Sequence, residues 1–168
     1  MKTKLRITSL FLILTVVCFG QQGTAWDKFT WLMGKWEGEG SGQPGQGGGT
    51  FSFEYDLDKE IIVRKSHSEY PATPDKPEVI HDDLMIIYMD GNPEPRAIYF
   101  DNEGHVINYS IIFTNNSIIL TSDVIENVPV FRLTYTLLGN NTINTEFGMS
   151  QDGTNFTTYI EGKSNKSK

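Results

Sequence analysis

Most of the chain after Gly40 consists of short segments in which apolar and polar residues alternate, separated by turn residues. This period of two is typical of half-buried β-strands, and no stretch of useful length after Gly34 has the period of a helix. The pattern predicts ten strands: Lys35–Ser41, Thr50–Leu57, Ile61–Tyr70, Val79–Asp90, Arg96–Asp101, Val106–Thr114, Ser117–Asp123, Val130–Leu138, Thr142–Met149 and Phe156–Gly162.

Short turns such as "DNEG" and "GNN" join most of these segments, which is typical of hairpins. Consecutive hairpins form an up-and-down meander, and ten twisted strands usually close on themselves to remove their edges. The predicted fold class is therefore all-β, an antiparallel up-and-down barrel of about ten strands. A short helix or turn over Trp26–Met33 is expected to cap one end, with Trp36 buried beneath it.

The first twenty residues have the pattern of a secretory signal peptide, with basic residues, then an apolar run, then small residues. Cleavage after Gly20 and after Ala25 both fit, and acylation of Cys18 is an alternative. We expect a signal peptide over residues 1–20, a single barrel domain over residues 21–168, and a secreted or periplasmic location.

Removal of the leader takes away three basic residues and no acidic ones, which changes the net charge from −7 to −10. Nucleic acid and anionic membrane surfaces are therefore poor partners. We expect no membrane span in the mature chain. It would also lack cysteine, so the domain must be stable without a disulfide.

The glycines at positions 34, 38, 40 and 42 alternate along the first strand, so a plug, a ligand or another strand could approach one of its faces closely. A phosphate-binding loop is disfavoured because the lysine, hydroxyl and helix that should follow it are missing. The motifs of nucleophilic hydrolases are missing as well.

The stretch "GKWEGEG" after "FTWLM" resembles the G-x-W opening strand of calycin barrels, in particular the fatty-acid-binding and nitrobindin-like (lipocalin-like) families. This resemblance implies a barrel that binds a small, largely apolar molecule inside it. The closing segment "FTTYIEGK" is similar to the last strand of nitrobindin-like domains, where the family has a haem-binding histidine. Tyr159 stands at that position, a departure that disfavours haem, although tyrosinate can bind ferric haem in other proteins.

Other polar groups could meet across the hairpin around "PATPDKPE". One register sets His67 opposite His81 and Lys65 opposite Asp83, with Glu69 on the same face. Such a cluster could bind a divalent metal through His67, His81 and Asp83, or act as an acid–base pair. The alternative is a polar ladder facing solvent, because a shift of one residue turns the cluster around.

The later strands alternate more clearly, and their pattern places Tyr109 and Tyr135 inside the barrel. An interior tyrosine can orient the polar end of a ligand or bond a backbone carbonyl. An interior Arg64 would anchor a carboxylate, whereas an exposed one would have no particular role.

Two functions follow from these patterns. The first is a binding protein for a small hydrophobic molecule, with ligand contacts from Arg64, His67, Glu69, His81, Tyr109, Tyr135 and Tyr159. The second is a barrel enzyme, either an isomerase or cyclase or a metal-dependent enzyme, that uses the histidine–carboxylate cluster at the barrel mouth.

Overall fold

Ten antiparallel strands close into a barrel in the computed structural model, which describes residues 25–40 and 48–167. The expected leader lies outside the described residues, as do Ser41 and Gly42 of the first predicted strand and loop. The strands are β1 (Gly34–Gly38), β2 (Gly48–Asp56), β3 (Ile61–Tyr70), β4 (Val79–Tyr88), β5 (Arg96–Asp101), β6 (Val106–Phe113), β7 (Ser117–Ser122), β8 (Val130–Gly139), β9 (Thr142–Ser150) and β10 (Thr157–Lys166). The predicted fold class and strand number are confirmed.

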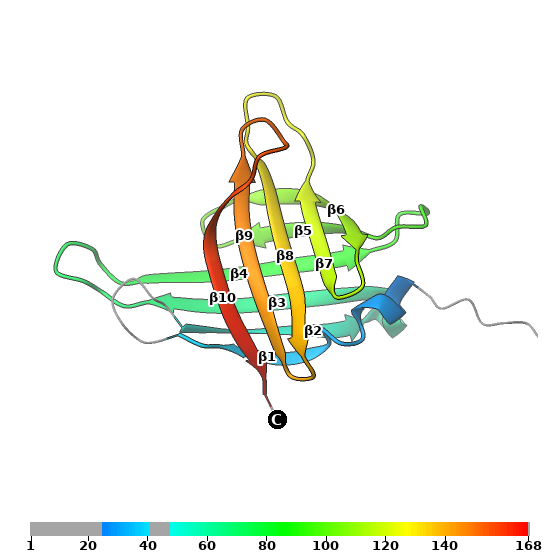
Figure 1. Cartoon of the computed structure of the whole chain (residues 1–168), viewed down its shortest axis with the longest axis horizontal. Helices are drawn as coiled ribbons and strands as arrows, with labels where there is room; N and C mark the ends of the chain where they lie inside the picture. The colour runs from blue at the N-terminus through cyan, green and yellow to red at the C-terminus, as the bar shows by residue number, and fades with distance from the viewer. Residues whose placement is uncertain (1–24, 41–47, 168) are drawn as a thin grey trace, which may run out of the picture.

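Each strand pairs with its neighbours in the chain, and β1 pairs with β10 to close the sheet. Figure 1 shows β8, β9 and β10 crossing β2, β3 and β4 at a steep angle. The sheet therefore wraps around one interior, and closure leaves no pair of long free edges.

The alternation seen in the sequence decides which side chains enter this interior. The predicted shared face of Ile107, Tyr109, Ile111 and Phe113 points inward on β6, as does the face carrying Tyr135 on β8. The fully buried apolar core consists of Phe29, Leu32, Trp36, Phe53, Ile62, Met85, Ile87, Ala97, Tyr109, Ile111, Ile118, Leu120, Tyr135 and Ile143.

One end of the barrel is covered by the segment before β1. A 3₁₀ helix, η1 (Ala25–Phe29), and the turn after it stand where a short helix or turn over Trp26–Met33 was expected. Phe29 and Leu32 are buried there, and the indole N–H of Trp36 donates to the Leu32 carbonyl at 2.7 Å. The predicted burial of Trp36 is confirmed, since its side chain is fully enclosed.

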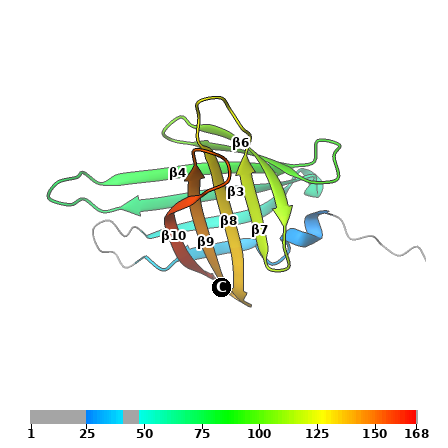
Figure 2. The same ribbon diagram turned by 45° about the horizontal axis from the view of Figure 1, so that its top comes forward.

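The opposite end, here called the mouth, is bordered by the loops 71–78, 102–105, 123–129 and 151–156. Figures 1 and 2 show the β3–β4 hairpin projecting beyond its neighbours, with η1 on the other side of the molecule. Among the described residues, no helix has the length and apolar character needed to cross a membrane.

Strand β10 carries a bulge near the mouth. Thr158 pairs with Gly148 and Ile160 pairs with Phe147, so Tyr159 is an extra residue without a partner in the ladder. A Cβ on Gly148 would lie 2.7 Å from the Thr157 carbonyl oxygen, which is closer than real Cβ atoms come. Glycine at position 148 therefore lets the bulged strand lie close against β9.

Candidate functional site

A buried ion pair lies inside the barrel between the apolar core and the mouth. Arg64 on β3 and Asp83 on β4 both point inward, and their side chains are only 9% and 6% exposed. The guanidinium Nη1 donates to Asp83 Oδ1. Burial disfavours the Arg64 cation, but Tyr135, Asp83 and Tyr99 outweigh this effect and raise its pKa. The interior therefore holds a charged but compensated pair.

Four buried side-chain atoms have no hydrogen-bond partner of good geometry among the described residues; one is Arg132 Nε, and the other three lie in the interior near this pair. These three are Arg64 Nε, the Tyr135 hydroxyl and Thr145 Oγ1. Tyr135 and Thr145 are cross-strand partners on β8 and β9, so their side chains lie on the same face. The Tyr135 hydroxyl lies close enough to the Arg64 guanidinium for a weak side-chain hydrogen bond, which opposes the rise of the Tyr135 pKa caused by burial, although the two groups do not meet the geometry of a full hydrogen bond. Buried polar groups are nearly always paired, which makes three unpaired ones in one interior unusual.

Two buried tyrosines, Tyr135 and Tyr109, lie in this part of the interior. Burial raises the pKa of Tyr135 to about 12, although Arg64 acts in the opposite direction. Burial also raises the pKa of Tyr109, and Tyr135 and Tyr159 add to that shift. These phenols therefore stay protonated at neutral pH and can donate hydrogen bonds inside the barrel.

A chain of hydrogen bonds leads from this interior to the mouth. His81 Nε2 lies 3.0 Å from the Tyr99 hydroxyl, which donates to Asp101 Oδ2 at 3.2 Å. Asp101 also accepts from His105 Nδ1 at 2.8 Å. Burial raises the pKa of Tyr99, with Asp83 and Asp101 adding to the shift. Asp83 and Asp101 are cross-strand partners, so this wall carries two adjacent carboxylates.

The wall formed by β8, β9 and β10 is apolar near the mouth. Phe131 and Phe147 stack there with ring centroids 5.9 Å apart, and the ring of Tyr159 meets Phe147 edge-on at 5.2 Å. Gly162 pairs with the inward-facing Thr145, and a Cβ built on it would have no atom within 4 Å. Gly162 is itself exposed, so the space beside its inward-facing position is open to solvent.

The predicted register of the β3–β4 hairpin is wrong by one residue. His67 lies opposite Asp82, and His81 lies opposite Ser68. His81 consequently faces the interior, whereas His67 and Glu69 are on the outer face, where the His67 ring contacts Asp82 Oδ1 at 2.6 Å and Glu69 Oε1 at 3.0 Å. The hydrogen bond with Glu69 raises the pKa of His67 most, and the one with Asp82 raises it further.

The expected metal and acid–base cluster is therefore not assembled, because His67 is separated from His81 and Asp83 by the sheet itself. Across residues 25–40 and 48–167, no group of three histidine, cysteine or carboxylate side chains is placed to hold a metal ion.

The position at which the nitrobindin-like resemblance expects a haem ligand does not favour haem. Tyr159 lies at the mouth with its side chain half exposed, and burial raises the pKa of its phenol. This shift disfavours the phenolate, which is the form that ligates iron. The described part of β10 carries no histidine.

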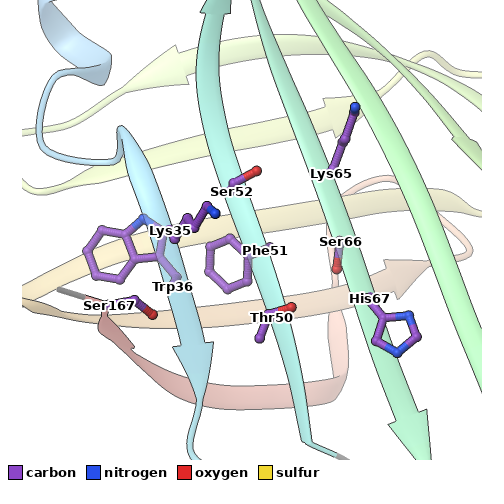
Figure 3. Close-up of a pocket in the computed structure, with 9 residues that line it drawn as sticks. All are labelled: Lys35, Trp36, Thr50, Phe51, Ser52, Lys65, Ser66, His67 and Ser167. Atoms are coloured by element: carbon purple, nitrogen blue, oxygen red, sulfur yellow. The ribbon is translucent and has the colours of Figure 1, made fainter.

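A groove of about 310 Å³ lies elsewhere, on the outer surface of β1, β2 and β3. Figure 3 shows Lys35, Ser52 and Lys65 on these three neighbouring strands, with Thr50 and His67 beside them. The Trp36 and Phe51 rings at this groove are stacked within the barrel. Because the groove is open and its polar groups are exposed to water, the interior is the stronger candidate for a binding site.

Sequence reasoning identified Arg64, Tyr109 and Tyr135 as candidates, and the structure places all three inside the barrel. It missed Thr145 and Tyr99, and it gave Asp83 a metal-binding role in place of pairing with Arg64. The alternation of "YFD" at residues 99–101 was the available signal, because it sets Tyr99 and Asp101 on one face.

The barrel is similar to a solved structure from M. tuberculosis, described as the crystal structure of Rv2717c. The match has a TM-score of 0.58 and 12% sequence identity, and it covers 87% of this chain and 99% of the other. Identity this low establishes a shared barrel fold and nothing beyond the fold. No model of a protein family matches this sequence, and no curated protein sequence is similar to it.

Proposed function

We propose that this protein binds a small, largely apolar molecule inside its barrel, with the polar end of that molecule against Arg64, Tyr135 and Thr145. The observation that carries the proposal is the set of three buried polar atoms without partners. Each costs about 1–3 kcal/mol while unpaired, and a ligand oxygen among them would recover part of that cost.

The side chains around these three atoms also suit a largely apolar ligand. Phe131 and Phe147 offer an apolar wall between the polar groups and the mouth, and Gly162 on β10 leaves the inward-facing position beside Thr145 without a side chain. Binding sites for small molecules are typically apolar with a few convergent polar groups. We further propose that the protein is exported, to the periplasm or outside the cell, on the basis of the leader pattern in residues 1–20.

The test begins with the purified mature protein, which is extracted with organic solvent so that bound molecules can be identified by mass spectrometry. The emptied protein is then titrated with apolar ligands while its melting temperature is measured. Ligands that bind only the folded state should raise that temperature in a concentration-dependent way.

A blocking variant locates the binding. Gly162→Leu adds a side chain at the inward-facing position that pairs with Thr145 and should abolish the thermal shift. Gly139→Leu is the matched control, because a Cβ at that position also meets nothing within 4 Å but lies at the β8–β9 hairpin, away from the mouth. The proposal fails when no apolar ligand shifts the wild-type protein or when Gly162→Leu binds as well as the control.

A further inference from the structure

The charge balance around Arg64 restricts what the polar end of a ligand can be. Arg64 is paired with Asp83, so its positive charge is already compensated inside the barrel. Asp101, the cross-strand partner of Asp83, adds a second carboxylate to the same wall, and its side chain is only 3% exposed.

The unpaired atoms require an acceptor. Arg64 Nε carries a hydrogen and has no lone pair to offer, so its partner must accept a hydrogen bond. The hydroxyls of Tyr135 and Thr145 can donate to the same group or accept from it. A ligand therefore needs at least one oxygen or nitrogen that accepts, and it is free to carry a donor as well.

A carboxylate would satisfy these donors but would bring a negative charge to a site where the Arg64 cation is already paired with Asp83, whose Oδ2 also lies 3.9 Å from His81 Nε2. Moving an ionised carboxylate out of water is costly unless an unpaired cation receives it. A nearby carboxylate of the same sign also disfavours ionisation of a second one. A neutral amide, ketone, ester or alcohol provides the acceptor without either cost.

We propose that the interior selects apolar molecules with a neutral hydrogen-bond-accepting end group over the corresponding carboxylates, and that Asp83 is the residue that sets this preference. The proposal rests on the function proposed above and specifies its ligand class. Asp83 acts here as a positioning and specificity-determining residue, because it occupies the guanidinium that would otherwise attract an anion.

The test compares decanamide with decanoate, which have the same chain and nearly the same end-group shape but differ in charge. Binding to the wild-type protein is measured by calorimetry at about pH 7.5, where the free acid is ionised. We expect decanamide to bind at least about tenfold more tightly, the equivalent of one pKa unit of discrimination.

Two further measurements attribute the difference to charge at Asp83. Decanoate binding should strengthen as the pH is lowered toward the carboxyl pKa, while decanamide binding changes little. Because His81 Nε2 lies 3.9 Å from Asp83 Oδ2 and can gain a proton over the same range, the series is repeated in His81→Gln, where the trend should persist. In Asp83→Asn the Arg64 cation loses its partner, so the preference should turn toward decanoate. Asp82→Asn is the matched control, because this neighbouring carboxylate is on the outer face with His67 and should leave the preference unchanged.

The outcomes separate this proposal from the preceding one. When wild-type protein binds neither decanamide nor decanoate nor any other apolar ligand, interior binding itself is refuted. When decanoate binds as tightly as decanamide at about pH 7.5, interior binding stands and the selection for neutral end groups is refuted. The comparison of decanamide with decanoate in wild-type protein at about pH 7.5 decides the question even when Asp83→Asn does not fold.

Discussion

Replacing the buried ion pair by apolar side chains should separate its contribution to stability from its contribution to binding. In Arg64→Met, Asp83 would remain 94% buried without its cation, because its side chain is only 6% exposed in the native barrel. Breaking a buried pair in this way costs about 3–5 kcal/mol. In a domain of this size, each kcal/mol lowers the melting temperature by about 2–4 °C, so a drop of roughly 10 °C is expected.

The double variant Arg64→Met/Asp83→Leu removes both charges and should regain most of this loss. Replacing a complete buried pair by apolar groups is often neutral or stabilising by about 1–4 kcal/mol. Urea unfolding followed by far-ultraviolet circular dichroism measures the free energy of unfolding for each variant. A double variant as unstable as Arg64→Met would refute the reasoning, because it would show that the barrel depends on the pair for folding. A stable double variant without ligand binding would show that the pair serves the site.

Three other changes test separate parts of the fold. Trp36→Ala should reduce the free energy of unfolding by about 3–5 kcal/mol in urea titrations, because it empties a fully buried site; a loss below about 1 kcal/mol would contradict the plugged end. Gly148→Ala should cost about 1–3 kcal/mol, since its Cβ meets the Thr157 carbonyl, and crystallography should show a displaced bulge; unchanged stability and geometry would contradict this. The His105–Asp101 contact raises the pKa of His105, so its contribution is complete below about pH 6.5 and is lost as the pH rises through the shifted value. Melting temperatures of wild type and His105→Gln should therefore converge at high pH, and a constant difference would disprove the linkage.

Local patterns predicted the strands well because each strand carries its own alternation. Tyr109 and Tyr135 lie on strands with one clearly apolar face, and both are buried as predicted. The first and last strands were less accurately bounded. Strand β10 continues to Lys166 through a polar run, because Ser164 faces inward and Lys166 lies over the Trp36 ring at 5.2 Å.

The register between β3 and β4 could not be predicted in the same way. Both faces of these strands carry apolar residues, and the loop between them is too long to fix the pairing. The observed register pairs odd with even positions, which sends Arg64 inward beside Met85 and separates His67 from His81. The bulge at Tyr159 could not be predicted either, because it depends on the close approach of β10 to β9 at Gly148.

The pairing of β1 with β10 has a consequence for how the chain folds. Every other bonded pair of strands is consecutive in the chain, so those hairpins can form as soon as both strands exist. The β1–β10 pairing, here called the seam, joins Trp36 to Lys166 and Gly38 to Ser164. These partners stand near opposite ends of the described chain. Before β10 is synthesised, β1 lacks this partner and the other strands can form only an open sheet with two free edges. The seam is also a short ladder, so its amides should be the first of the barrel to exchange with solvent when the closed form opens.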